Sequence, residues 1–588
     1  MESPIAQEAQ PLKNIYMVFL GCCVGLLGGF GAVVFRLLIN LIHNLFFFGH
    51  ISLIYNANIH TPAVTFAFAI ILIPVMGAVL VTFLVENFAP EAKGHGVPEA
   101  IYAIFYKHGK IRPIVALIKA VTSAISIGTG GSVGREGPII QIGSAFGSTL
   151  GQLVSMPTRQ RVLLIAAGAG AGIAATFNAP IGGLAFAIEL MLVSVNAISI
   201  GVVTVATVTA TFISYFFFGA APALGSLNLI YIKSYEDYFM ILLLLIPFGI
   251  LIGIISAVFI KSLYWFEDLF VNNIKQPYLR HMLGMAIVGC MLYLFMFFLG
   301  HYYIDGVGYA TIEDVLHFVI QNPWILLLLF VGKLLATCLT LGSGASGGIF
   351  SPSLFMGATF GGAYGIILNN LFPQLNVSPI VYVVAGMAGV IGGGTGAIVT
   401  AITMTFEMTR DYADILPIMI TVSIAYATRL KLSDESIYTL KLFRRGYILP
   451  KGLETSFVSA KRASNIMDRN IKIIPKEQIQ EYYAKCQSQK DIKYIIVNGG
   501  GAVQGILNTE IDAFIANTSP ELLIDKNFLW IDAKTIWINL LRDMDVTKNP
   551  ILLVTRSMTS KTAEDIIGVI TYREIISATR EHAILSNG

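Results

Sequence analysis

Long apolar segments alternate with short, glycine-rich apolar segments from residue 15 to about residue 430 of the chain. An α-helix needs roughly 20 apolar residues to cross the hydrocarbon core of a bilayer. Segments that approach or exceed this length cover 15–42, 64–86, 198–218, 239–261, 282–300, 324–341 and 414–428. The pattern predicts an all-α, polytopic membrane protein over this part of the chain.

Between these segments lie apolar pieces that are mostly too short to span a bilayer alone. They cover 113–128, 138–154, 161–175, 179–195, 351–369 and 379–408. They predict broken or re-entrant helices, which are stable at membrane depth only where protein or a water-filled cavity surrounds them. We therefore expect a transport site among these short segments.

An internal repeat relates two parts of the apolar region. Lys333 lies 214 residues after Lys119, and four additional residues bring Glu407 onto Glu189. The offset of 214 also aligns Gly128, Gly130, Ser132, Gly134, Pro138, Gly143, Phe146 and Gly147 with identical residues. The match predicts two related halves, roughly 15–220 and 235–449. Charges within apolar sequence are functional candidates, but their recurrence in both halves fits a structural role equally well.

The composition changes after Tyr447. Residues 455–588 are rich in charged side chains and contain no apolar run long enough to span a bilayer. Two strand, strand, helix patterns occur there, with strands at 494–497 and 503–507 and then at 551–555 and 566–571, and helices from about 509 and over 572–579. We expect a polar tail over 1–14, a membrane domain over 15–449 and a small soluble α/β domain over 450–588.

Composition supports this division. Of 588 residues, 55% are hydrophobic and 12% are charged, about half the usual 25% of charged residues, and the mean hydropathy is +0.73. A soluble protein would lack the polar surface to cover so many apolar side chains, so we expect lipid as a partner. The net charge of +3 and the lack of a basic run interleaved with aromatic residues argue against nucleic acid.

The chain offers no sign of a metal centre or a cleaved leader. Its five cysteines are scattered, with neither metal-ligand spacing nor a disulfide framework. Residues 1–13 lack a basic region and a cleavage site. A membrane-embedded enzyme would need a nucleophile, base or metal cluster, and the apolar region contains none. We expect no enzyme, no metal and no cofactor.

Three helix starts carry the chemistry expected for anion transport. They are marked by glycine and proline at 94–98 (Gly-His-Gly-Val-Pro), 134–138 (Gly-Arg-Glu-Gly-Pro) and 348–352 (Gly-Ile-Phe-Ser-Pro). Free N–H groups and the helix dipole attract anions at such starts. The carboxylate of Glu136 is itself an anion and can occupy such a site. Protonation would release it, so this residue can gate a path and carry a proton, although it could instead only cap its helix.

The motifs at 134–138 and 348–352 resemble two signature motifs of the CLC family of chloride channels and transporters. The segment 94–98 is similar to a third, and Phe177-Asn178-Ala179-Pro180 and Glu435-Ser436-Ile437-Tyr438 fit in order. The resemblance covers residues 15 to about 450. It implies a homodimer with a separate pathway in each subunit, built from two inverted repeats of tilted and broken helices.

The same resemblance implies roles for single residues. Glu136 would be the gating and proton-carrying glutamate. Anion-binding groups would come from His95, Gly96, Arg135, Ile349, Phe350 and Tyr438. The alternative for Tyr438 is an aromatic anchor at the membrane interface.

Two departures from the family pattern bear on mechanism. The first motif usually carries serine where this chain has His95, whose neutral ring could donate in place of the hydroxyl or could turn aside. Proton-coupled members usually carry a second glutamate directly after the position of Glu189, where this chain has Leu190. Either coupling is lost, or Glu189 or a water chain serves as the proton path.

The soluble tail resembles a pair of CBS modules. Gly568-Val569-Ile570-Thr571 followed by Glu574 is similar to the nucleotide-contacting pattern, with Glu574 where aspartate is usual, while the first copy has Ile511 there. Thr571 and Glu574 are thus candidates for adenine-nucleotide binding. These departures favour a role of the tail in packing and dimer contact over tight nucleotide binding.

The expected function is chloride transport, either as a glutamate-gated, voltage-gated-type channel or as a Cl⁻/H⁺ antiporter. Alternatives are transport of another anion such as nitrate, or a membrane-anchored nucleotide sensor. Basic residues at 107–112 and 429–445 indicate cytoplasmic flanks. They predict a multi-pass protein of the cell (inner) membrane with a cytoplasmic C-terminal domain.

Overall fold

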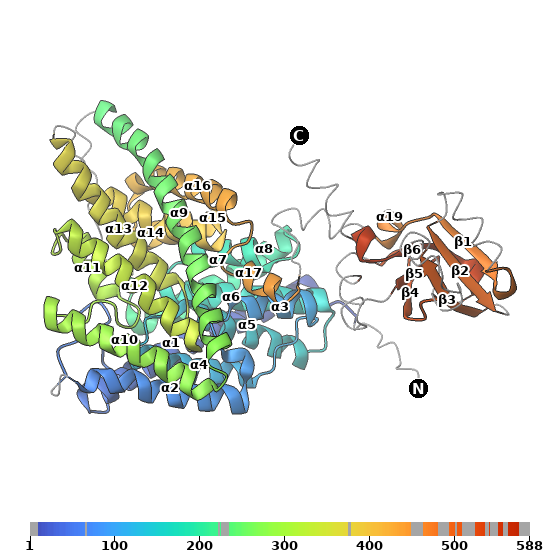
Figure 1. Cartoon of the computed structure of the whole chain (residues 1–588), viewed down its shortest axis with the longest axis horizontal. Coiled ribbons are helices and arrows are strands. Elements are labelled where there is room, and N and C mark those ends of the chain that lie inside the picture. The colour runs from blue at the N-terminus through green and yellow to red at the C-terminus, as the bar shows by residue number, and fades with distance from the viewer. Residues whose placement is uncertain are drawn as a thin grey trace. The chain divides into compact units, whose positions relative to one another are not determined.

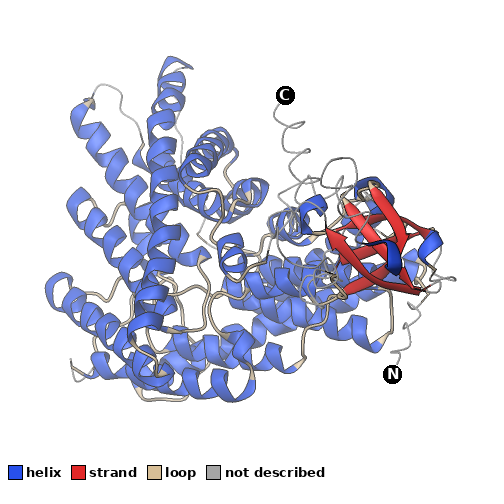
Figure 2. Cartoon of the chain, turned by 45° about the vertical axis from the view of Figure 1, so that its right-hand side comes forward, coloured by secondary structure: helices blue, strands red, loops and turns tan. Residues whose placement is uncertain are grey.

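The chain divides into two compact units, Met1–Leu449 and Pro450–Gly588. The computed structural model describes residues 10–64, 68–221, 224, 235–373, 378–447, 462–479, 493–499, 502–508, 524–535, 540, 551–556 and 562–575. The first unit is helical, and the described strands lie in the second (Figures 1 and 2). The expected polar tail and the expected helix from about residue 509 lie mostly outside the described residues.

The helices of the first unit form two successive series. The first series is α1 (Asn14–His43), α2 (Ala69–Phe88), α3 (Val97–Tyr106), α4 (Ile114–Gly128), α5 (Glu136–Leu153), α6 (Thr158–Phe177), α7 (Pro180–Phe186) and α8 (Ala197–Phe218). The second is α9 (Tyr235–Asn273), α10 (Pro277–Leu299), α11 (Tyr309–Leu316), α12 (Pro323–Ser343), α13 (Phe350–Leu371), α14 (Pro379–Thr395), α15 (Ile398–Thr409) and α16 (Ile415–Leu432). The short helix α17 (Thr439–Arg444) follows them.

Equivalent helices of the two series pack through equivalent glycines. A Cβ atom on Gly143 of α5 would overlap the carbonyl oxygen of Gly168 of α6, and the reverse also holds. Gly357 of α13 and Gly386 of α14 stand in the same relation. Only residues without a side chain allow backbones to approach this closely. The all-α, inverted-repeat fold expected from the sequence is confirmed.

The surface of the helical unit matches a lipid environment. Eight helices among the described residues are long and apolar enough to cross a bilayer. Large apolar side chains cover outward-facing parts of them, for example Phe212 and Phe216 on α8 and Phe297 and Phe298 on α10. A water-soluble protein does not expose apolar surface on this scale, so the unit is an integral membrane domain.

Several segments differ from the expected boundaries. Residues 161–175 belong to α6, which is long enough to span. Residues 379–408 break into α14 and α15, with Gly396 in a left-handed conformation between them. The short helices α3 and α11 are absent from the apolar segments predicted by hydropathy, because each has only ten or eight residues.

The second unit contains two similar small sheets. Strands β1 (Ile471–Pro475), β2 (Tyr494–Gly499) and β3 (Ala502–Asn508) form the first sheet, and β4 (Phe528–Asp532), β5 (Ile551–Thr555) and β6 (Ile566–Ile570) form the second. In each sheet the first pair is parallel and the second is antiparallel, with a register shift in the second pair. The matching topology confirms a soluble α/β domain with two copies of one pattern.

Candidate anion-binding site

Backbone hydrogen bonds join the loops that precede the three predicted helix starts. Gly134 and Gly348 exchange both N–H···O bonds, at 2.8 and 2.6 Å. The loop before α3 is held beside the same segment, because Gly94 donates to Ala345 at 3.0 Å and accepts from Gly347 at 3.3 Å. The starts of α3, α5 and α13 therefore meet at one place, as the sequence predicted for a shared anion site.

The carboxylate of Glu136 reaches from the start of α5 to the start of α13. It is fully buried. Its Oε1 accepts a hydrogen bond from the Tyr309 hydroxyl at 2.8 Å and another from the Ser351 hydroxyl. Its Oε2 accepts from the Ser351 backbone N–H at 3.3 Å. This negatively charged group thus occupies the electropositive start of the helix in the other half.

The backbone N–H groups of Ile349 and Phe350 lie at the same start of α13. Within the described part of the chain, neither donates to a protein oxygen. The first N–H groups of a helix have no partner inside the helix, so these two can bind an anion. Both residues are buried, each 1% exposed. Their role as anion donors stays a prediction.

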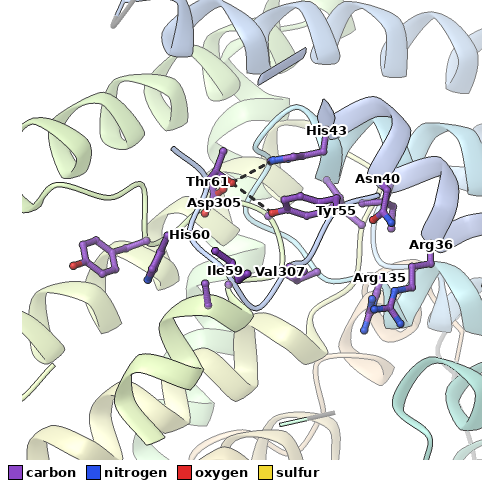
Figure 3. Close-up of a pocket in the computed structure, with 17 residues that line it drawn as sticks. Arg36, Asn40, His43, Tyr55, Ile59, His60, Thr61, Arg135, Asp305 and Val307 are labelled. Atoms are coloured by element: carbon purple, nitrogen blue, oxygen red, sulfur yellow. Dashed lines mark hydrogen bonds between the residues drawn. The ribbon is translucent and has the colours of Figure 1, made fainter. Parts of the chain in front are cut away.

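Arg135 lies on one side of Glu136, where a cavity of about 40 Å³ opens. Figure 3 shows its guanidinium beside Arg36 at one end of this cavity, with His60 and Asp305 farther along it. The guanidinium also lies over the Tyr309 ring, 5.2 Å from the ring centre. Two arginines favour entry of an anion here.

His95 and Tyr438 lie near the same helix starts, and the backbone carbonyl of His95 lies against Gly137. Both are buried, their ring centres are 5.7 Å apart, and the Tyr438 hydroxyl has no hydrogen-bond partner among the described residues. The Tyr264 hydroxyl donates to the Ile437 carbonyl at 2.5 Å and lies 3.4 Å from Nε2 of His95. Since Tyr264 has one proton, the network assigns the His95 proton to Nε2 and directs it to Tyr264.

Burial, and then the nearby charge of Lys441, hold the pKa of the His95 imidazole well below its usual range. The ring is therefore neutral, and its one N–H is used within the protein. Nδ1, which is buried and has no partner among the described residues, carries a lone pair and cannot donate. This geometry favours Tyr438 over the His95 ring as the donor to an anion.

A second cavity, of about 130 Å³, opens beside His95 and Tyr264. Its charged lining consists of Lys93, Lys441, Arg445 and one carboxylate, Glu267. The excess of positive charge favours anions here as well. Arg135 lines the first cavity and His95 lines the second.

Comparison with known proteins agrees with this arrangement. Residues 77–430 match the family described as "Voltage gated chloride channel". The chain belongs to this CLC family.

Individual CLC relatives extend the match. The "H(+)/Cl(-) exchange transporter ClcA" of Vibrio cholerae serotype O1 is 34% identical over 383 residues, which cover 62% of this chain and 76% of that protein. A solved structure of a slow cyanobacterial Cl⁻/H⁺ antiporter has a TM-score of 0.62 at 26% identity, covering 74% of this chain and 99% of the other. A eukaryotic CLC transporter has a TM-score of 0.63 at 18% identity over 95% and 98% of the two chains. The last likeness shows the fold alone.

Two buried lysines hold the loops of this CLC site. Lys119 of α4 donates to the carbonyls of Ala92 and Gly94 at 2.9 and 2.6 Å. Lys333 of α12 donates to the carbonyls of Ile304 and Gly306 at 3.0 and 2.9 Å. Each lysine therefore fixes the loop that leads into the short helix before it, α3 in one half and α11 in the other.

Glu189 and Glu407 cap helices of the opposite halves. Glu189 accepts from the backbone N–H groups of Val399 and Thr400 at 3.0 and 2.9 Å, at the start of α15. Glu407 accepts from Ile181 and Gly182 at 3.1 and 2.7 Å, at the start of α7. These contacts favour the structural interpretation of both residues. A proton path through Glu189 stays a prediction.

Thr571 and Glu574 in the soluble domain contact each other rather than an open site. One carboxylate oxygen of Glu574 accepts from both the backbone N–H and the hydroxyl of Thr571. The other accepts from the Tyr494 hydroxyl at 2.9 Å. Burial raises the pKa of the Tyr494 phenol, so it keeps its proton and donates. A nucleotide would have to replace these donors, and its binding stays a prediction.

Sequence reasoning missed Tyr309, Tyr264 and the side chain of Ser351. Ser351 lies inside the motif at 348–352, so its hydroxyl could have been predicted as a hydrogen-bond donor in the site. Tyr309 follows Gly308, and the pair Gly306 and Gly308 stands 212 residues after Gly94 and Gly96. Comparison at that slightly different offset would have placed Tyr309 at a helix start. No sequence feature connects Tyr264 with the site.

Proposed function

We propose that this protein carries chloride across a bilayer along a path that Glu136 closes when ionised. The observation that carries the proposal is the buried Glu136 carboxylate on the Ser351 N–H at the start of α13. A chloride ion would use the same electropositive position after the carboxylate has left. The named chloride transport of relatives at 34% identity supports this choice of anion.

The proposed path connects the two cavities. An anion would pass Arg36 and Arg135, the position now held by Glu136, and then Tyr438 before it reaches the cavity near Lys441. Cationic side chains lie at both ends of the path, so it attracts anions from either side of the membrane. The unpartnered hydroxyl of Tyr438 supplies a donor between them without a full charge.

Coupling to protons is the open part of the proposed function. Relatives named as H⁺/Cl⁻ exchangers favour antiport, in which Glu136 would take up a proton on one side of the membrane and release it on the other. Leu190 cannot carry a proton and favours passive conduction. The reversal potential of purified protein across a pH gradient separates the two, because it shifts with the gradient only when proton and chloride fluxes are coupled.

We further propose a homodimer in the cell (inner) membrane, with two separate pathways and the soluble domain in the cytoplasm. Basic residues Arg444 and Arg445 of the segment that leads to this domain support a cytoplasmic flank. The cavity near Lys441 and Arg445 would then face the cytoplasm. The soluble domain would act through packing, dimer contact or a bound adenine nucleotide.

Anion efflux from liposomes tests the central proposal. Wild-type efflux should rise as the pH falls, because protonation neutralises Glu136 and releases it. Glu136→Gln has no titratable proton at this position, so its efflux should be independent of pH. Chloride and nitrate are compared in the same assay to determine selectivity. A Glu136→Gln variant with the wild-type pH profile would contradict the proposed gate.

A further inference from the structure

We propose that the hydroxyls of Tyr309 and Ser351 form a dock that holds the ionised Glu136 carboxylate in the anion path and sets the pH at which it leaves. This inference rests on the proposed gating function of Glu136. It assigns to two further residues a positioning role that determines the balance between the closed and the open path.

The contacts of the dock are direct. Both hydroxyls donate to the same oxygen, Oε1 of Glu136, and they lie 3.1 Å from each other. Tyr309 and Ser351 are buried, with exposed fractions of 3% and 0%. A hydrogen bond from a hydroxyl to a charged carboxylate is stronger than one between neutral groups. The dock therefore stabilises the ionised form of Glu136 more than the protonated form.

The surrounding backbone is shaped to receive the carboxylate. A Cβ atom on Gly134 would overlap Oε2 of Glu136 and would crowd the Ser351 N–H. The missing side chain leaves space for Glu136 to fold back against the start of α13. Tyr309 in turn follows Gly308, which has a φ of +80° and on which a Cβ atom would overlap Phe355. Glycine at that position lets α11 begin close enough for the phenol to reach.

Tyr309 is held in place by groups other than Glu136. Lys333 fixes the loop before α11 through the carbonyls of Ile304 and Gly306, and the guanidinium of Arg135 covers the Tyr309 ring. The phenol is thus preorganised and loses little freedom when the carboxylate arrives.

The dock also accounts for release. While Glu136 is ionised, both protons point to its carboxylate. Once it is protonated and moves away, Tyr309 and Ser351 can bond to each other across the existing 3.1 Å. Neither of these two hydroxyls is then left without a partner, which would otherwise oppose opening.

Other groups that act on Glu136 stay unchanged when the dock is altered. Arg135 precedes it, Lys333 of α12 and Tyr438 interact with it electrostatically, and the Ser351 N–H donates to it. Substitution of the two hydroxyls removes none of these. A change in the pH profile would therefore report the dock itself.

The test is the pH dependence of chloride efflux from liposomes that contain the full-length protein. Tyr309→Phe and Ser351→Ala should each raise the half-activation pH by about one unit, a tenfold change in the balance between docked and released carboxylate, and the double variant by about two. Each profile is scaled to that variant's own maximal efflux at low pH, so that a change in chloride binding does not alter the half-activation pH.

Matched controls remove a hydroxyl elsewhere. Tyr382→Phe alters a buried tyrosine whose hydroxyl has no partner among the described residues, and Ser353→Ala alters a serine of α13 that donates to Ile349. Both should keep the wild-type half-activation pH. An unshifted half-activation pH in both Tyr309→Phe and Ser351→Ala would overturn the dock.

A Glu136→Ala background separates this inference from the proposed function. With no carboxylate to hold, Tyr309→Phe should leave the pH profile of Glu136→Ala as it is, and a shift there would overturn the dock. If Glu136→Gln keeps the wild-type pH profile, the proposed function fails. If that variant is independent of pH while the dock variants are unshifted, only the dock fails. Thermal unfolding of each variant in detergent identifies any variant that fails to fold. If one of the two dock variants fails to fold, the half-activation pH of the other single variant tests the dock.

Discussion

The two halves of the membrane domain share their scaffold and differ at their site. Each half has a lysine that fixes a loop, Lys119 in the first and Lys333 in the second. Each half also has a glutamate that caps a helix of the other half, Glu189 in the first and Glu407 in the second. At the matched helix starts, by contrast, Glu136 in the first half corresponds to Phe350 in the second. The duplicated residues hold the backbone, and the residues that differ include those of the proposed anion path.

The same division appears at the short helices. His95 between two glycines corresponds to Val307, and Val97 at the start of α3 corresponds to Tyr309 at the start of α11. One half supplies the carboxylate of Glu136, and the other supplies the hydroxyls of Tyr309 and Ser351 that donate to it. A single asymmetric site can thus form between two similar halves, in which the duplicated residues hold the scaffold and other residues form the site.

The largest effect on stability is expected at Lys333. In Lys333→Met the carbonyls of Ile304 and Gly306 lose the one donor they have among the described residues. An unpaired buried polar group costs about 1–3 kcal/mol, so we expect a loss of about 2–4 kcal/mol. Thermal unfolding of the purified protein in detergent measures it as a lower Tm.

Lys119→Met is the matched control in the other half. Its two carbonyl partners keep a second donor each, because Ala92 also accepts from the Ser346 hydroxyl and Gly94 from the Gly347 N–H. The decrease in Tm should therefore be smaller than for Lys333→Met. Equal decreases would show that the hydrogen-bond count does not distinguish the two halves.

A smaller effect is expected for the two capping glutamates. Glu189→Gln and Glu407→Gln keep an acceptor oxygen but remove the charge at a helix start, which is worth about 0.3–1 kcal/mol when exposed and up to about 2 when partly buried. The two substitutions should lower the Tm by similar amounts, and the two variants should move protons to a similar extent in the efflux assay. Selective loss of proton transport in Glu189→Gln would instead support the proton path through that residue and break the symmetry.

The smallest effect on the membrane domain is expected from a change in the soluble domain, the second duplicated part of the chain. Tyr494→Phe removes one hydrogen bond to the buried Glu574 carboxylate, worth about 1.5–3 kcal/mol because the acceptor is charged. The effect is confined to local unfolding, so it should appear as faster amide hydrogen exchange in residues 562–575 with unchanged chloride efflux. Unchanged exchange, or an equal change in the membrane domain, would contradict this assignment.

Hydropathy and the glycine-proline motifs in the sequence determined much of the fold. Apolar length predicts spanning helices from one-dimensional information, since the bilayer has a fixed thickness. The repeat from Lys119 to Lys333 predicts related halves, and the motif around Glu136 predicts a helix start that faces an anion. The convergence of the loops at Gly134 and Gly348 agrees with this reading.

Only the tertiary structure decided which side chains from distant segments meet around Glu136. Tyr309 lies 173 residues from Glu136, and α11 is too short to produce a hydropathy signal. Tyr264 reaches His95 from the last third of a long apolar helix, where nothing local distinguishes it from its neighbours. Such contacts depend on how inverted halves pack against each other, and packing is a property of the assembled backbone that neither motif nor periodicity encodes.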